Sequence, residues 1–109
     1  MGQYCKGSID AVKARKELEK TGLFSEGALR TFDWFAEEVY TSQGDEVVTT
    51  IRKAAAIVGC DPEIIRNYGK QGKIRVEDNM YFFKFVPYQE IIKAKRIYLK
   101  NTANRRNHD

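Results

Sequence analysis

The sequence predicts a mostly helical protein with one small β-hairpin, and three observations indicate this fold class. Residues 50–74 have the pattern of two short helices joined by a tight turn. Residues 74–86 contain two runs of β-branched and aromatic residues, which favour strands. The first 44 residues contain two more segments with helical spacing of apolar residues. A chain of 109 residues, 42% of them hydrophobic, is long enough for one modest core.

The first helix of the 50–74 segment has a clear start and a clear end. Thr49 or Thr50 can cap it, because a hydroxyl accepts the free amide hydrogens of a first turn. Three alanines at 54–56 favour helix and allow another helix to approach closely. Gly59 ends the helix, since glycine most easily adopts the positive φ needed there. The inward face is predicted to contain Ile51, Ala55 and Val58.

A second helix is predicted over about 62–71. Asp61 can accept the amide hydrogens of its first turn, and Pro62 fits there because no donor is lost. Only Cys60 separates the two helices, so they must meet at a sharp angle, and Gly72 ends the second one. Its apolar side contains Ile64, Ile65 and Tyr68. Its polar side contains Glu63, Arg66, Asn67, Lys70 and Gln71.

The polar side of this second helix has the chemistry of DNA recognition. Arg66 can bind guanine or a phosphate through its forked guanidinium group. Asn67 and Gln71 have the donor–acceptor pair that matches the major-groove edge of adenine. Lys70 suits a phosphate. A solvated polar face is the alternative, but the turn before the helix favours contact with a DNA groove.

The runs at 74–76 and 81–86 predict a hairpin, or wing, beside the two helices, with its turn at 77–79. One aromatic row, made of Tyr81, Phe83 and Phe85, is expected to cover the core for the most part. Arg75 and Lys84 lie on the predicted strands. They could contact the sugar–phosphate backbone, or they could be ordinary exposed charges.

From residue 51 to residue 74 the chain resembles the winged helix-turn-helix of MerR-type regulators and excisionase-like domains. The matching residues are Ile51, Ala55, Gly59, Glu63, Ile65, Arg66, Tyr68 and Gly72. The resemblance covers about 45 residues with the wing, and it implies that Arg66 and Tyr68 lie at the DNA interface or support it. The wing departs from the family pattern, since its usual arginine is absent and Lys84 is at best a substitute. The candidate DNA-binding residues are therefore Glu63, Arg66, Asn67, Tyr68, Lys70, Gln71, Lys73, Arg75 and Lys84.

The net charge of +4 is unevenly distributed along the chain. Residues 1–44 contain six Lys/Arg and seven Asp/Glu, a balance of −1, whereas residues 45–109 contain thirteen and eight, a balance of +5. The cationic half thus coincides with the helix-turn-helix pattern, which favours a polyanionic partner. No stretch has the apolar length of a membrane helix or the pattern of a secretion signal, so a cytoplasmic protein is expected.

Enzyme and metal chemistry are not expected from this sequence, and neither is a cofactor. Cys5, Cys60 and His108 are too few and too scattered for a zinc site. No glycine-rich phosphate loop is present, and the acidic pairs at 37–38 and 77–78 have the pattern of solvated charges.

A further helix, begun by Pro87, is predicted over 88–100. Its inward stripe is Ile91, Ala94 or Lys95, and Tyr98 or Leu99. Residues 101–109 lack apolar anchors and predict a flexible tail. Arg105 and Arg106 in this tail could reach a phosphate, or the tail could simply aid solubility.

Residues 1–44 predict a helical N-terminal extension that serves as a packing layer or a dimer contact. Ser8 can cap a helix through about Lys20, and Ser25 a second helix through about Tyr40. The second helix is aromatic on one side, which is more often core than partner surface. Residues 42–45 are the best candidate for a joint to the winged helix-turn-helix domain at 45–100.

The sequence therefore favours a sequence-specific DNA-binding protein over other functions. It could be a small transcription regulator, or an excisionase-like recombination or architectural factor, and a viral packaging subunit is a further alternative. Partners would be double-stranded DNA, a second copy in a homodimer, and a recombinase or the transcription machinery. A function of a different class is a protein-interaction module that uses the aromatic 25–41 helix, with the helix-turn-helix as scaffold.

Overall fold

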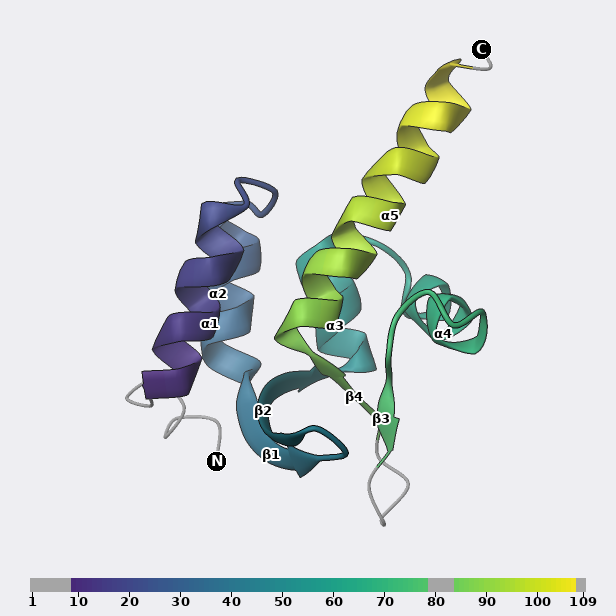
Figure 1. Cartoon of the computed structure of the whole chain (residues 1–109). Helices are drawn as coiled ribbons and strands as arrows, with labels where there is room; N and C mark the ends of the chain where they lie inside the picture. Colours follow the sequence, from purple (N-terminus) through teal and green to yellow (C-terminus); the bar gives the residue numbers. More distant parts are fainter. Residues whose placement is uncertain (1–8, 79–83, 108–109) are drawn as a thin grey trace.

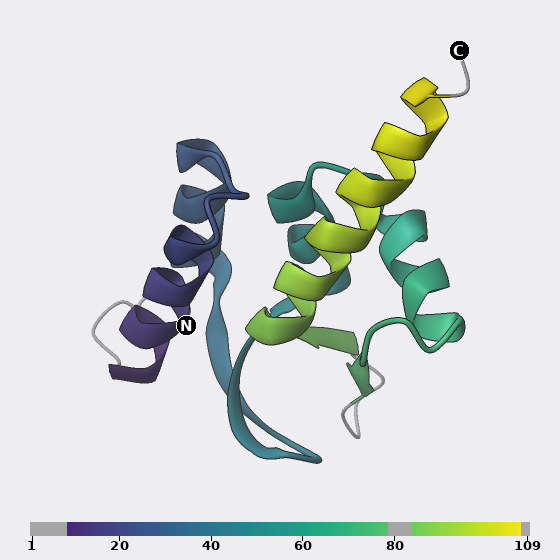
Figure 2. The ribbon, with the colours of Figure 1, turned by 45° about the horizontal axis from the view of Figure 1, so that its top comes forward.

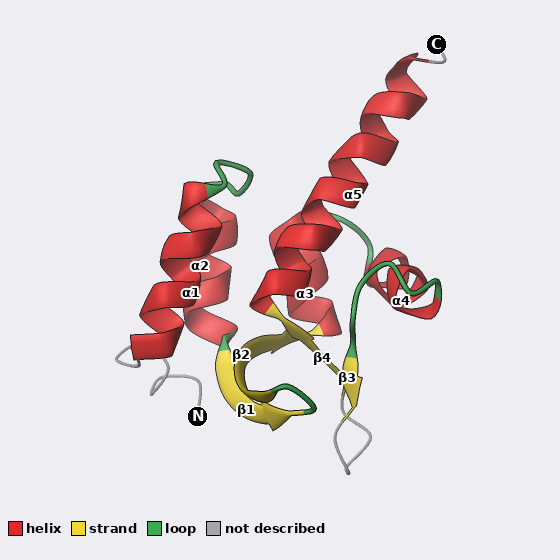
Figure 3. Ribbon diagram, viewed as in Figure 1, coloured by secondary structure: helices red, strands yellow, loops and turns green. Residues whose placement is uncertain are grey.

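The computed structural model describes residues 9–78 and 84–107, which form a mostly helical fold with a small, curled antiparallel sheet (Figure 1). The helices lie on one side of the sheet, and α5 extends beyond the rest of the fold (Figure 3). In chain order the elements are α1 (Ile9–Lys20), α2 (Glu26–Phe35), β1 (Glu37–Thr41), β2 (Gly44–Thr50), α3 (Ile51–Val58), α4 (Pro62–Lys70), β3 (Glu77–Asp78), β4 (Lys84–Pro87) and α5 (Tyr88–Asn107).

The sheet has the strand order β1-β2-β4-β3, with every neighbouring pair antiparallel. The predicted hairpin thus forms only half of the sheet. The other half is a β1–β2 hairpin in which Glu37 faces Val48 and Thr41 faces Gly44. Strand β2 holds the two hairpins together, since it also pairs with β4.

The prediction of one helix from Ser25 to about Tyr40 is wrong at its C-terminal end. Ser25 does cap α2, and its hydroxyl accepts the amide hydrogen of Ala28 at 3.1 Å. The helix stops at Phe35 because the next residues pair with β2, which takes them out of the helical spacing. Residues 42–45, predicted as a joint, lie at the turn of the β1–β2 hairpin, where Gly44 has φ of +95°.

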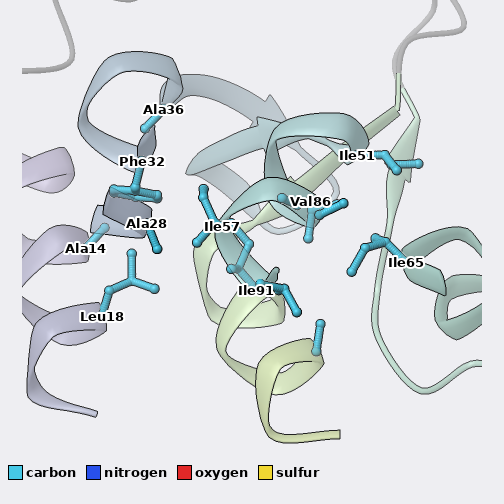
Figure 4. Close-up of a cluster of buried hydrophobic side chains, with 14 of the residues drawn as sticks. Ala14, Leu18, Ala28, Phe32, Ala36, Ile51, Ile57, Ile65, Val86 and Ile91 are labelled. Atoms are coloured by element: carbon cyan, nitrogen blue, oxygen red, sulfur yellow. The ribbon is translucent and has the colours of Figure 1, made fainter. Parts of the chain in front are cut away.

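One continuous hydrophobic core holds the helices to the sheet. Leu18 of α1 and Phe32 of α2 approach it from one side, and Ile65 of α4 approaches it from the other (Figure 4). Ile57 of α3 lies between them, and Val86 of β4 also belongs to the cluster (Figure 4). The residues before position 45 therefore share a core with α3 and α4.

Helix α5 is longer than the sequence predicted. Ile91 and Ala94 are fully buried, as expected, whereas Leu99 is 40% exposed. Residues 101–107, which the sequence predicted as part of a flexible tail, continue the helix. Lys95 donates a hydrogen bond from Nζ to the carbonyl oxygen of Val58 at 2.8 Å, and so satisfies the end of α3. None of the described helices is both long enough and apolar enough to cross a membrane.

Candidate nucleic-acid interface

Local caps define the start of α3 and both sides of the turn between α3 and α4. The hydroxyl of Thr50 accepts the amide hydrogen of Lys53, and so begins α3 where β2 ends. Gly59 ends α3 with φ of +90°, and its amide donates to the carbonyl oxygen of Ala55 at 2.7 Å. Asp61 then caps α4 by accepting the amide hydrogen of Glu63 at 3.0 Å. The predicted caps and the tight turn are confirmed.

Helix α4 exposes one polar face. Glu63, Arg66, Asn67, Lys70 and Gln71 are all solvent-exposed, as predicted. Arg66 pairs with Glu63 across one turn, with 3.2 Å between Nη1 and Oε1. Both side chains are about half exposed or more, at 47% and 61%, so the pair adds little stability and leaves the guanidinium free to rearrange. Lys73, just after the helix, is exposed as well.

Tyr68 lies on the opposite side of α4 and is only 6% exposed. Its hydroxyl accepts a hydrogen bond from Asn101 of α5, and the Lys73 ammonium lies 5.6 Å from the centre of its ring. Tyr68 therefore fixes α4 against the core.

The β3–β4 ribbon, which we call the wing, occupies a different stretch of sequence than the predicted hairpin. Residues 74–76 are not a strand, and the residues 77–78 that were expected in the turn form β3. Strand β3 pairs with β4, where Asp78 faces Lys84 and their side chains form an exposed ion pair at 3.0 Å. The predicted strand residues Tyr81 and Phe83 lie outside the described residues, and Phe85 is half-buried.

A hollow of about 260 Å³ separates α4 from the wing. It brings together three of the predicted site residues, Arg66, Lys70 and Lys84. The sequence placed the first two on one helix and Lys84 on a strand. Asp78 is the one carboxylate among the residues that line it, and Ile51, Gly69 and Val76 supply the rest of the wall. The arrangement suits a phosphate-bearing ligand because three cations converge on one concave surface.

Arg75 does not belong to this cationic surface. Its guanidinium donates to Glu77 and, at 2.7 Å, to Glu46 of β2. Its backbone amide donates at 2.7 Å to Glu90, a carboxylate of α5 that is 6% exposed. Glu77 in turn accepts hydrogen bonds from Ser42 at the tip of the β1–β2 hairpin. Arg75 therefore ties the start of the wing to β2, and the sequence offered no local signal of these distant partners.

The same network lowers the pKa of two carboxyl groups. For Glu46, burial favours the neutral acid, but hydrogen bonds from Arg75 and Thr41 and the charge of Arg75 outweigh it. For Glu77, hydrogen bonding from Ser42 is the main cause of the lowered pKa, and Arg75 adds to it against the effect of burial. Both side chains are therefore held as carboxylates in the folded protein.

Gly69 allows α4 to lie against the segment that leads into the wing. A Cβ atom at this position would lie 2.8 Å from Cγ2 of Val76, which is closer than side-chain carbons pack. Gly69→Ala is therefore expected to destabilise the protein by about 1–2 kcal/mol, although alanine favours helix. Urea denaturation would measure this change.

Gly27 provides a matched control, since a Cβ there would meet only the Ser25 hydroxyl at 3.9 Å. Gly27→Ala is expected to raise stability by about 0.5–1 kcal/mol through helix propensity alone. Adding Val76→Ala should make Gly69→Ala much less harmful than it is alone. A Gly69→Ala variant as stable as the Gly27→Ala variant would show that α4 and residue 76 do not pack this closely.

The described residues contain no group of three or more His, Cys, Asp or Glu side chains placed to hold a metal ion. Cys60 in the turn is half-buried, and burial with the charge of nearby Asp61 raises the pKa of its thiol to about 11. It therefore remains a protonated thiol at neutral pH and makes a poor nucleophile.

Comparison of the chain with protein-family models, curated proteins and solved structures gives no match.

Proposed function

We propose that this protein binds double-stranded DNA, with α4 in the major groove and the β3–β4 ribbon against the sugar–phosphate backbone. One observation carries the proposal. The turn that begins at Gly59 leads into α4, whose apolar side is buried. The outer face of α4 exposes Arg66, Asn67, Lys70 and Gln71. Recognition helices have this division, with base-reading amides and guanidinium groups beside phosphate-binding cations.

The hollow between α4 and the wing supports the same proposal. Arg66 and Lys70 on the helix and Lys84 on the ribbon line one concavity, so a phosphate strand that follows it would meet cations from both elements. We further propose that the fold is a winged helix-turn-helix of the MerR or excisionase type and that the protein acts in the cytoplasm. A small transcription regulator would protect a promoter from cleavage, whereas an excisionase-like factor would bend DNA or bind repeated sites cooperatively.

The test compares the wild type with Arg66→Ala/Lys70→Ala in binding a mixed pool of fluorescent duplexes over a salt series. The double variant is expected to bind about 10- to 100-fold more weakly and to reduce the slope of log K against log salt by about 2, because two cations no longer displace counterions. Selection of sequences from the pool would then identify the bases read by Asn67 and Gln71.

Arg30→Ala/Lys53→Ala is the matched control, since it also removes one arginine and one lysine. Arg30 is on α2. Lys53 is on α3, but its ammonium lies 3.9 Å from the ring centre of Phe35, which is on α2. Both cations are therefore on the side away from α4. This control should bind duplexes like the wild type. Folded wild-type protein that binds no duplex even at low salt would overturn the proposal, with circular dichroism as the check on folding.

A second candidate function rests on exposed aromatic side chains near the end of α2 and in β1. Trp34 is 57% exposed, Phe35 45% and Tyr40 83%, and these are the largest exposed aromatic fractions among the described residues. Aromatic residues are enriched at protein interfaces, so this region suits a protein partner. Folded wild-type protein that binds no duplex even at low salt would favour this candidate over the first.

A further inference from the structure

A second cationic hollow lies between α1 and α5, away from α4. It has a volume of about 550 Å³ and is lined by Lys13, Lys16, Glu17, Lys20, Thr21, Ile92 and Arg96. Four cations thus face one carboxylate. That carboxylate is already engaged, since Glu17 accepts a hydrogen bond from the hydroxyl of Tyr88 at 3.0 Å. We call this surface the α1–α5 groove.

The four cations of the α1–α5 groove are exposed and form no ion pair with any residue in the described ranges 9–78 and 84–107. Other cations of the protein are engaged. Arg15 pairs with Asp33 and Glu19, Lys53 lies over Phe35, and Lys95 caps α3. The groove differs from these sites because its four cations are left exposed to solvent.

Cations line both walls of the groove. On the α1 wall they are Lys13, Lys16 and Lys20, and on the α5 wall the cation is Arg96. Like charges three and four residues apart destabilise a helix, so helix stability does not explain the row on α1. This row spans about 10 Å at 1.5 Å per residue. This length corresponds to about three phosphates along one strand of duplex DNA.

We propose that the α1–α5 groove binds the phosphate backbone of a second segment of duplex DNA. A row of three cations on α1 that faces Arg96 of α5 suits an extended polyanion better than a single phosphate ion, and a concave surface suits a strand better than a flat bilayer. Helices α1 and α4 lie on opposite sides of α3 and α5 (Figures 1 and 2). A duplex bound at α4 therefore leaves the groove accessible to another segment. The inference rests on the proposed binding of duplex by α4.

The test measures capture of one duplex by another. A duplex of about 20 base pairs is fixed to beads, the protein is added, and retention of a fluorescent duplex of the same length is recorded, beside the affinity for a single free duplex. The groove variant Lys16→Gln/Arg96→Gln removes one cation from each wall. A second variant, Lys13→Gln/Lys20→Gln, removes two from α1, and Arg30→Gln/Lys53→Gln is the control with equal charge loss. All of these cations except Lys53, which is partly buried, are exposed, and circular dichroism confirms folding.

The proposal predicts that wild type and control retain the fluorescent duplex, and that both groove variants retain at least about fivefold less. Their affinity for a single duplex should stay within about twofold of wild type, because α4 still binds it. Capture by the groove variants equal to that by wild type would overturn the inference and assign the second duplex to a second copy of the α4 surface.

Two other outcomes would overturn the proposed function together with this inference, unlike equal capture by the groove variants, which overturns the inference alone. If Arg66→Ala/Lys70→Ala binds a single duplex like wild type while the groove variants bind none, the α4 proposal fails and so does the two-segment inference. If the wild type binds no duplex but binds vesicles of phosphatidylcholine and phosphatidylserine, the protein binds a lipid surface instead of DNA and the inference is overturned.

Discussion

Phe32→Ala is expected to lower the free energy of unfolding by about 3–5 kcal/mol, since a large aromatic side chain leaves a cavity that the core fills only in part. Phe32 is 1% exposed and is the largest of the fully buried side chains. It lies in α2, yet it belongs to the same cluster as Ile57 of α3 and Val86 of β4 (Figure 4). Since domains of this size are stable by only about 5–15 kcal/mol, the loss would be a large fraction of the total.

Urea denaturation followed by two signals would measure this loss and test how the core is organised. The single tryptophan, Trp34, reports on α2, whereas circular dichroism reports on all helices. Because the core is continuous, both signals should shift together to lower urea in the Phe32→Ala variant. Phe35→Ala is the control. Phe35 is 45% exposed and contacts the Lys53 ammonium, so we expect a loss of about 1 kcal/mol or less.

Separate transitions, with the tryptophan signal changing at lower urea, would contradict this expectation. They would mean that α1 and α2 unfold independently of α3 and α4 and contribute little to the stability of these two helices. The N-terminal residues would then be an added layer rather than a part of the core.

The parts of the fold that were predictable are those with local causes. The caps at Thr50, Gly59 and Asp61 lie next to the helices that they begin or end, so the sequence alone located α3, α4 and the turn. The exposed face of α4 follows from helical spacing, and the structure leaves Arg66 and Lys70 on the surface where the spacing placed them.

The parts that failed depend on distant partners. The segment at 37–41 continues the apolar spacing of α2, and only its pairing with β2 turns it into a strand. Residues 77–78 have the composition of a turn, so the sequence did not indicate that they form β3. Asp78 pairs with Lys84 because β3 lies beside β4. Lys16 and Arg96 are eighty residues apart and share a hollow only because α1 packs beside α5. None of these neighbours can be found from local patterns.

Arg75→Ala is expected to destabilise the protein by about 2–3 kcal/mol, less than for a fully buried pair because the side chain is 30% exposed. The loss arises because Glu46 and Glu77, with side chains 15% and 12% exposed, would remain as carboxylates without their shared cation. Arg75→Lys should recover only part of it, since one ammonium group cannot bond to both carboxylates as the forked guanidinium does. Urea denaturation at pH 7 would measure both changes.

The lowered pKa values of Glu46 and Glu77 predict how this stability depends on pH. A carboxyl group whose pKa is lower in the folded protein than the ordinary 4.5 contributes stability above that pH and loses it as the pH falls through the folded-state value. The wild type should therefore lose stability on acidification below about pH 5, and Arg75→Ala should lose less, since part of the cause is already removed. Equal slopes for the two proteins below pH 5 would show that Arg75 does not hold these carboxylates.

The same variant separates a structural role of Arg75 from the backbone contact that the sequence allowed. Because its guanidinium is directed at Glu46 and Glu77, the folded Arg75→Ala protein should bind duplex DNA within about twofold of wild type, with the same salt slope. Fluorescence anisotropy at 10 °C, with folding checked by circular dichroism, would measure both quantities. A salt slope reduced by about 1 would instead mean that Arg75 leaves its carboxylates to bind a phosphate. In that case the network of Glu46 and Glu77 would be a state of the free protein that DNA replaces.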